Sequence, residues 1–285
     1  MRSEESGPLF LYKGKGENSM NSVNKTLYIP LYGKSYVSKK GIILKDTKAE
    51  EIWKTSGFPL KGKSKSKWLA YYMGMRSKVF DNWLKKQMEQ DKDAVIFHIG
   101  CGMDSRIERV GTKEHDWFDV DFPDVIAERR QFYKETDKYH MVESDARENA
   151  WIQTLPADKN AIILMEGVSM YFQLEELKKL LAELCGHFNR VHLLMDCYTV
   201  FAAKASKYKN PINEVGVTTV YGIDEPRVLE DKTGLSFVEE LDLTPTYLVD
   251  ELRGMEKAIF KKVFAGDFAK KMYRLFEFEG INGKR

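Results

Sequence analysis

The first third of the chain spaces its apolar residues as a helix does. From Lys25 to about Gln90 the pattern is helical rather than strand-like. One stripe is especially regular, with members at Leu69, Tyr72, Met73, Arg76, Phe80, Trp83 and Gln87. This spacing predicts a single long amphipathic helix. We expect residues 24–92 to form a helical cap, preceded by a flexible N-terminal arm at 1–23.

After residue 93, short apolar runs alternate with helical stretches. The expected strands are 94–100, 115–121, 139–145, 161–167 and 190–196, with helices at 123–135 and 173–187. Near-continuous apolar runs such as Ala161–Met165 suit parallel strands covered on both faces. Two later runs, 235–241 and 258–264, are expected to close the sheet as a strand pair. The pattern predicts an α/β fold over 93–285, a doubly wound sheet with one reversed strand. An insertion at 197–234 is expected to form a lid over the substrate.

Composition narrows the class of protein. The 285 residues carry 45 basic and 43 acidic side chains, and this balance does not favour a nucleic-acid partner. The basic run Lys61–Lys67 is expected to be a solvated linker. Three cysteines at unrelated spacing form neither a metal-ligand pattern nor a disulfide framework. No signal-peptide pattern or membrane-span length of apolar residues is present. We therefore expect a cytoplasmic protein without a bound metal or a membrane partner.

The segment His98–Arg106 carries the main chemical signal. It follows the apolar run Ala94–Phe97, and it contains Gly100, Cys101 and Gly102 in a Gly-x-Gly turn. Asp121 ends the next expected strand, about 20 residues on, where a carboxylate can accept hydrogen bonds from a ribose diol. The layout predicts an adenosine-containing cofactor. Because Ser105 stands where a third glycine or an alanine belongs, the full dinucleotide fingerprint is missing. The alternative is an ordinary strand-to-helix turn with an acid nearby.

Four acids end expected strands, namely Asp121, Asp145, Glu166 and Asp196. Ligands of doubly wound sheets bind beyond the carboxyl ends of the strands. Together these acids favour a cationic ligand that also bears hydroxyl and amine groups, and S-adenosylmethionine is such a ligand. Singly, each acid is more typical of a loop or a helix N-cap.

Each charged group has an expected role toward this ligand. Asp121 is expected to hold the ribose diol, Asp145 the adenine amine and Glu166 the ammonium group. Arg76 is expected to bind the ligand's carboxylate, since a buried guanidinium needs a charged partner. The alternative is that Arg76 pairs with an acid of the protein itself.

Several segments resemble the leucine carboxyl methyltransferase superfamily. They are His98–Arg106, Phe118–Pro123, Met165–Tyr171 and Met75–Asp81, the last being similar to the family's arginine-bearing helix. Three more, Thr26–Tyr32, Tyr221–Pro226 and Gly234–Glu240, resemble the bacterial branch of tetracenomycin-type polyketide O-methyltransferases. The resemblance runs from about residue 24 to 264. It departs from the family pattern at Ser105, where threonine is usual, and at His98, where asparagine is common.

The resemblance implies a seven-stranded class I methyltransferase fold with a helical cap. It assigns a set of residues to S-adenosylmethionine, whose demethylated product is S-adenosylhomocysteine. The set is Arg76, Gly100, Asp121, Asp145 with Ala146, and Glu166, with Lys25 matching a family lysine near the cofactor.

The residues leave several functions open. The main interpretation is an O-methyltransferase acting on a carboxylate or hydroxyl of a small molecule, polyketide-like or another secondary metabolite. Tyr171, just beyond Glu166, is the candidate for contact with the acceptor. The alternatives are a protein C-terminal carboxyl methyltransferase and a non-catalytic S-adenosylmethionine-binding protein. An NAD-dependent oxidoreductase is disfavoured by the missing third glycine and by the long helical segment before the first nucleotide-binding strand.

Overall fold

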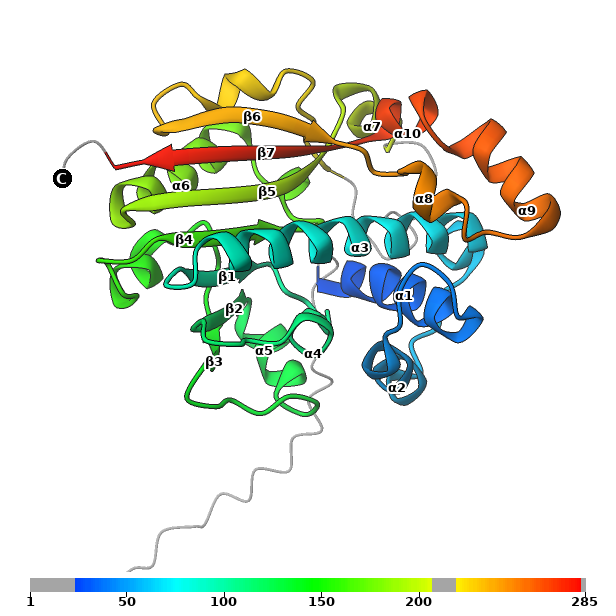
Figure 1. Ribbon diagram of the computed structural model, residues 1–285, viewed down its shortest axis with the longest axis horizontal. Coiled ribbons are helices and arrows are strands. Elements are labelled where there is room, and N and C mark those ends of the chain that lie inside the picture. Colours follow the sequence, from blue (N-terminus) through cyan, green and yellow to red (C-terminus); the bar gives the residue numbers. More distant parts are fainter. Residues whose placement is uncertain (1–23, 207–218, 283–285) are drawn as a thin grey trace, which may run out of the picture.

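A seven-stranded sheet runs through the centre of the protein (Figure 1). The computed structural model describes residues 24–206 and 219–282, so the expected arm at 1–23 lies outside it. The strand order is β3-β2-β1-β4-β5-β7-β6. The strands are β1 (Val95–Ile99), β2 (Trp117–Asp121), β3 (Tyr139–Glu143), β4 (Ala161–Met165), β5 (Arg190–Tyr198), β6 (Leu235–Leu241) and β7 (Tyr273–Ile281). The first five are parallel, whereas β7 is antiparallel to both of its neighbours. The predicted doubly wound fold with one reversed strand is confirmed.

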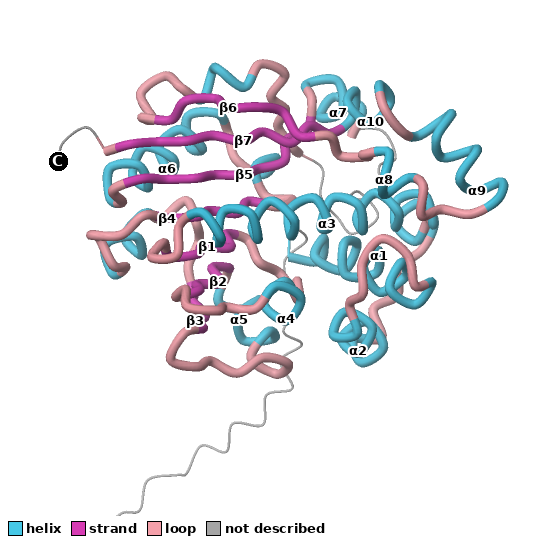
Figure 2. The backbone as a smooth tube through the Cα atoms, in the orientation of Figure 1, coloured by secondary structure: helices cyan, strands magenta, loops and turns pink. Residues whose placement is uncertain are grey.

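Helices cover both faces of this sheet (Figure 2). They are α1 (Tyr28–Lys40), α2 (Thr47–Ser56), α3 (Lys67–Gln90), α4 (Arg106–Val110), α5 (Pro123–Arg129), α6 (Leu174–His187), α7 (Val200–Ala205), α8 (Thr246–Val249), α9 (Gly254–Ile259) and α10 (Asp267–Met272). Within the two described ranges, none of the helices has the length and the apolar character needed to cross a membrane.

The central strand β4 shows why the parallel strands could be predicted. Ile162 and Leu164 belong to the core cluster that includes α1 and α3 residues, whereas Ile163 and Met165 belong to the cluster that includes α6. Because side chains alternate across a strand, a strand buried on both faces must be apolar throughout.

The predicted long helix is confirmed as α3. The Ser66 hydroxyl caps its first turn by accepting the N–H of Trp68 at 3.3 Å. Arg76 lies in the middle of the helix and is only 3% exposed. The apolar stripe thus carries a charged group into the interior, next to the sheet.

The prediction of a strand at 258–264 is wrong, because this segment is helical. It comprises the end of α9 and a π-helical turn at Phe260–Phe264. Phe260 is fully buried while Lys261 and Lys262 are exposed, which is the one-sided burial of a helix rather than the alternation of a strand. The true partner of β6 is β7, whose Phe276 and Phe278 are completely buried.

The insertion lies where it was predicted, between β5 and β6. Its described parts include α7 and a 3₁₀ turn at Pro226–Leu229. Residues 207–218 of the expected lid lie outside the described residues.

Candidate functional site

The glycine turn after β1 is shaped by positive backbone angles. Gly100 has φ +67° and Gly102 has φ +52°, a region that residues with a side chain rarely adopt. A Cβ on Gly100 would lie 2.1 Å from Val168 Cγ2, in the loop after β4. The turn therefore requires glycine for its conformation and for its close packing against the neighbouring strand end.

Asp121 faces this turn from the end of β2. Its carboxylate accepts the N–H of Gly102 at 2.7 Å and the N–H of Phe122 at 2.8 Å. Burial raises the pKa of Asp121 from 3.8 to about 6. A carboxylate with this pKa is ionised at neutral pH and is held against the glycine backbone, as a ribose-binding acid must be.

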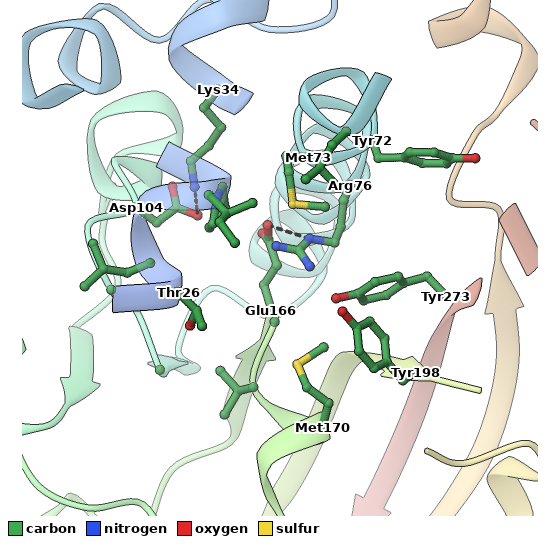
Figure 3. A pocket seen from close by; sticks show the side chains of 18 of the residues that line it. Thr26, Lys34, Tyr72, Met73, Arg76, Asp104, Glu166, Met170, Tyr198 and Tyr273 are labelled. Atoms are coloured by element: carbon green, nitrogen blue, oxygen red, sulfur yellow. Dashed lines mark hydrogen bonds and ion pairs between the residues drawn. The ribbon is translucent and has the colours of Figure 1, made fainter. Parts of the chain in front are cut away.

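Arg76 connects α3 to the ends of β4 and β5. Its Nε donates to Glu166 at 3.0 Å (Figure 3). Its Nη1 donates to Asp196 at 2.8 Å. Burial lowers the pKa of Arg76, but Asp196 and Glu166 raise it by more, so the pKa lies above its ordinary value. The guanidinium is therefore paired with two acids of the protein, which is the alternative that the sequence left open.

Arg106 is a second buried guanidinium beside Glu166. It donates to Glu166 and, through Nε, to Asp81 at 2.8 Å. Burial raises the pKa of Glu166, but Arg106 and Arg76 lower it by more, to about 2. Glu166 is thus a permanent anion, unable to act as a base at neutral pH.

Lys34 and Asp104 bring another ion pair to the same place. Lys34 Nζ on α1 lies 3.2 Å from an Asp104 carboxylate oxygen in the loop after β1 (Figure 3). Both side chains are almost fully buried, with 3% and 6% of their area exposed. The sequence reading missed Lys34, Asp104 and Arg106 as site residues. Asp104 and Arg106 carried a signal, because both belong to the glycine-containing segment His98–Arg106, whereas Lys34 carried none.

Lys34, Arg76, Asp104 and Glu166 line one cavity of about 620 Å³, together with the glycine turn and Asp121. Arg106 and Asp196 lie behind this lining and hold Glu166 and Arg76. The volume of the cavity is in the range of sites for small molecules and cofactors. Of the residues predicted from the sequence, seven line this cavity: Arg76, Gly100, Cys101, Gly102, Asp121, Glu166 and Tyr171.

The other three predicted residues lie outside the cavity lining. Lys25 is half-buried in the 3₁₀ turn Asn24–Leu27, whose Thr26 and Leu27 do line the cavity. Asp145 and Ala146 follow β3, and the Asp145 carboxylate accepts from Arg147 Nη2 at 2.6 Å. Burial raises the pKa of Asp145, but Arg147 outweighs it and lowers the pKa overall.

Tyr171 and His98 are two further titratable groups that line the cavity. The Tyr171 hydroxyl donates to Thr26 Oγ1 at 3.1 Å, and burial raises its pKa. His98 Nε2 lies 3.0 Å from Arg106 Nη1, so it accepts from the guanidinium, and burial lowers the pKa of the imidazole. Neither is poised to remove a proton from an acceptor at neutral pH.

Known proteins are similar to this chain in sequence and in fold. The leucine carboxyl methyltransferase family model matches residues 23–185. The tetracenomycin polyketide synthesis O-methyltransferase TcmP of Streptomyces glaucescens is 29% identical over 184 residues, which cover 64% of this chain and 68% of that protein. The S-adenosyl-L-methionine-dependent methyltransferase dpfgK of Gibberella zeae is 24% identical over 257 residues, with coverage of 82% and 86%.

Solved structures agree on the fold. The magnesium protoporphyrin IX methyltransferase of Synechocystis PCC 6803, with bound S-adenosylhomocysteine, is 12% identical with a TM-score of 0.50, covering 88% of this chain and 99% of that one. A second solved structure, of a protein from Thermobifida fusca YX, has a TM-score of 0.53 at 12% identity, covering 87% of this chain and 93% of that one. The match of the family model over more than half of the sequence, together with this fold, places the chain in the leucine carboxyl methyltransferase family, as an S-adenosylmethionine-dependent methyltransferase.

Proposed function

We propose that this enzyme transfers the methyl group to an oxygen of a small molecule, a carboxylate or an ionised hydroxyl of a polyketide-like or similar secondary metabolite. The observation that carries the proposal is the division of the cavity. Its polar half contains the glycine turn, Asp121, Arg76 and Glu166, and its other half is lined by aromatic and aliphatic side chains. A charged nucleoside suits the first half and an apolar acceptor suits the second.

The polar half fits S-adenosylmethionine in charge and in shape. The glycine turn lets a ligand approach the backbone, and Asp121 supplies the anion beside it. We assign Asp121 to the ribose diol, Glu166 to the ammonium group and Arg76 to the carboxylate. Because Nε and Nη1 of Arg76 bond to Glu166 and Asp196, Arg76 must bind the carboxylate through Nη2 or release one of these acids. Gly100, Cys101 and Gly102 would contact the ligand through the turn. Asp145, Ala146 and Lys25 are assigned to the adenine end and its surroundings. For Asp145 to bind there, its carboxylate must exchange Arg147 for the adenine amine.

The residues of the chain act mainly by positioning. When bound, S-adenosylmethionine supplies an electrophilic methyl group, which the acceptor oxygen takes as the carbon–sulfur bond breaks and S-adenosylhomocysteine remains. Holding acceptor and methyl in line provides much of the rate in such displacements. Tyr171 is our candidate for contact with the acceptor near the strand ends.

An acceptor that is already ionised fits the acids and bases present. Glu166 and Asp104 are locked in ion pairs, and His98 accepts from Arg106. Burial raises the pKa of Tyr171, so its phenolate is scarce at neutral pH. A carboxylate or an acidic phenol needs no base, which is why we favour these acceptors over alcohols.

We retain two further assignments as proposals. Residues 24–92 would act as a cap on the α/β domain 93–285, with 197–234 as a lid. The cytoplasm is the proposed location, because Cys101, Cys185 and Cys197 are all free thiols and a reducing compartment keeps them so.

Calorimetric titration of the full chain tests the donor, with S-adenosylmethionine and NAD as the two ligands. We expect S-adenosylmethionine to bind and NAD not to bind. Mass spectrometry of aromatic acids and phenols incubated with enzyme and donor should then show the gain of one methyl group. Binding of NAD without binding of S-adenosylmethionine would contradict the proposal. Transfer of the methyl group to protein C-termini and to none of the small molecules would contradict it as well.

A further inference from the structure

The aromatic half of the cavity is built largely by the connection between β6 and β7. Phe264, Phe268 and Met272 come from this connection, and Trp68 and Tyr72 face the cavity from α3. Trp68 and Phe264 stack with ring centroids 5.1 Å apart and planes 21° apart. The Tyr72 hydroxyl donates to the Phe264 carbonyl, which ties the two walls together. The sequence had assigned this role to the insertion at 197–234, which contributes Tyr198 and Ala205 to the lining.

This aromatic cluster is not simply a closed core. Phe268 lines the cavity and yet is 45% exposed, and it meets Phe264 edge-on at 6.0 Å. Because this ring lines the cavity and is also open to solvent, a ligand that enters the cavity can pack against it. The rings therefore form a wall that a flat apolar ligand can complete.

Two tyrosines lie where the aromatic and polar halves meet. Tyr198 at the end of β5 pairs in register with Tyr273 at the start of β7. Their rings are edge-to-face at 4.5 Å, and Figure 3 shows both hydroxyls turned toward one another and toward Arg76. The Arg76 guanidinium carbon is 5.7 Å from the centre of the Tyr273 ring. The pair thus presents two hydroxyl groups beside the cation that we assign to the donor.

We propose that this half of the cavity is the acceptor subsite, and that it takes an aromatic acid or acidic phenol whose nucleophilic oxygen is oriented by the hydroxyls of Tyr198 and Tyr273. The rings of the acceptor lie against Trp68, Phe264 and Phe268. The inference rests on the proposed function and adds the class of acceptor and the residues that select it. Tyr198 and Tyr273 are positioning residues that hold the oxygen through hydrogen bonds, while the bond to carbon forms without proton transfer to them.

The aromatic wall is tested by binding of a fluorescent probe, anthracene-2-carboxylate, to the full chain saturated with S-adenosylhomocysteine. We expect Phe268→Ala to weaken probe binding roughly 2- to 12-fold, because one aromatic contact is worth about 0.5–1.5 kcal/mol. Tyr247→Ala is the matched control, since Tyr247 is a 54% exposed aromatic residue of the same connection and does not line the cavity. Equal weakening by both variants, or decanoate binding as tightly as the probe, would overturn the proposed subsite.

The tyrosine pair is tested by Tyr273→Phe, which removes one hydroxyl and keeps the ring. With anthracene-2-carboxylate as acceptor, we expect kcat to fall roughly tenfold, while the Kd for S-adenosylmethionine and the Tm remain those of the wild type. A purely structural role would instead lower the Tm and leave kcat unchanged, and that result would remove Tyr273 from the subsite. Calorimetry separates the two levels of the argument. If the wild type does not bind the donor, the proposed function itself is contradicted. If the donor binds but Phe268→Ala and Tyr273→Phe have no effect, only the acceptor subsite is contradicted.

Discussion

Removing the Arg76 guanidinium tests whether the ion pairs of Arg76 with Glu166 and Asp196 stabilise the fold at the centre of the site. In Arg76→Gln, Glu166 keeps Arg106 and the Ser77 hydroxyl as partners. The Asp196 carboxylate loses its guanidinium and keeps the N–H of Gly167, at 2.6 Å. Asp196 is completely buried. Leaving one buried charge of a pair without its partner costs about 3–5 kcal/mol. For a chain of this size the Tm should fall by roughly 6–10 °C, at about 2 °C per kcal/mol.

The loss in this variant should depend on pH. Burial already raises the pKa of Asp196 above 3.8, and Arg76 opposes that rise. Without Arg76 the folded-state pKa rises further, while the unfolded chain keeps its ordinary value near 3.9. Between these two values the folded variant binds the extra proton, so its stability falls as pH rises. The deficit relative to wild type should be smaller near pH 5 than near pH 8.

Urea unfolding followed by the fluorescence of the five tryptophans measures both effects. The matched rescue is the double variant Arg76→Gln with Asp196→Asn, which removes the orphaned charge. We expect it to recover about 1–2 kcal/mol relative to Arg76→Gln, since side chains in direct contact couple by amounts of this order. A deficit that is the same at both pH values and unrelieved by Asp196→Asn would refute the reasoning.

Three further predictions concern the donor, the acceptor and the glycine turn. Asp121→Ala should abolish binding of S-adenosylmethionine. In the wild type, the affinity should fall as pH drops through about 6, where the buried carboxylate takes up a proton. Calorimetry measures both effects, and an affinity that does not change with pH would contradict the ribose assignment. Tyr171→Phe should lower turnover and leave donor affinity intact, and an unchanged kcat would remove Tyr171 from the acceptor site. Gly100→Ala should cost roughly 2–4 kcal/mol, from its positive φ and from overlap with Val168. Adding Val168→Ala to Gly100→Ala should relieve the overlap but not the strain of the positive φ. Thermal unfolding measures the stability of both variants, and complete recovery of wild-type stability would show that φ contributes nothing.

The parallel part of the sheet could be predicted because burial on both faces leaves a strong signal. Strand β4 is a continuous apolar run and β1 is apolar except for His98, and the structure buries every residue of both. The glycine turn and Asp121 were recognisable for a similar reason, since they lie close together in the sequence and their spacing is fixed by one strand–turn–helix unit.

The end of the sheet was harder to predict. Residues 258–264 mix apolar and lysine residues in an order that fits either a helix or a strand over so short a run. The true last strand, Tyr273–Ile281, carries an alternation of Phe276 and Phe278 with Glu277 and Glu279. That signal was present but weak, because Glu277 is itself 4% exposed and so does not mark a solvent face.

The partners of the buried charges could not be predicted from local patterns. Arg76 bonds to Glu166 and Asp196, which are 90 and 120 residues away in the sequence. Lys34 reaches Asp104 from a different helix. Such pairs arise only when α1, α3 and the strand ends are brought together, so spacing along the chain carries no trace of them.

The position of β7 has a consequence for synthesis of the chain. Strand β7 follows β6 in the sequence but lies between β5 and β6 in the sheet, where it joins them. While the ribosome is still translating, both neighbours present open backbone donors and acceptors to solvent, a state that invites pairing with other nascent chains. A transcript truncated before codon 273 should therefore yield a product that aggregates or is cleared by proteases, even though it encodes all five parallel strands and the glycine turn.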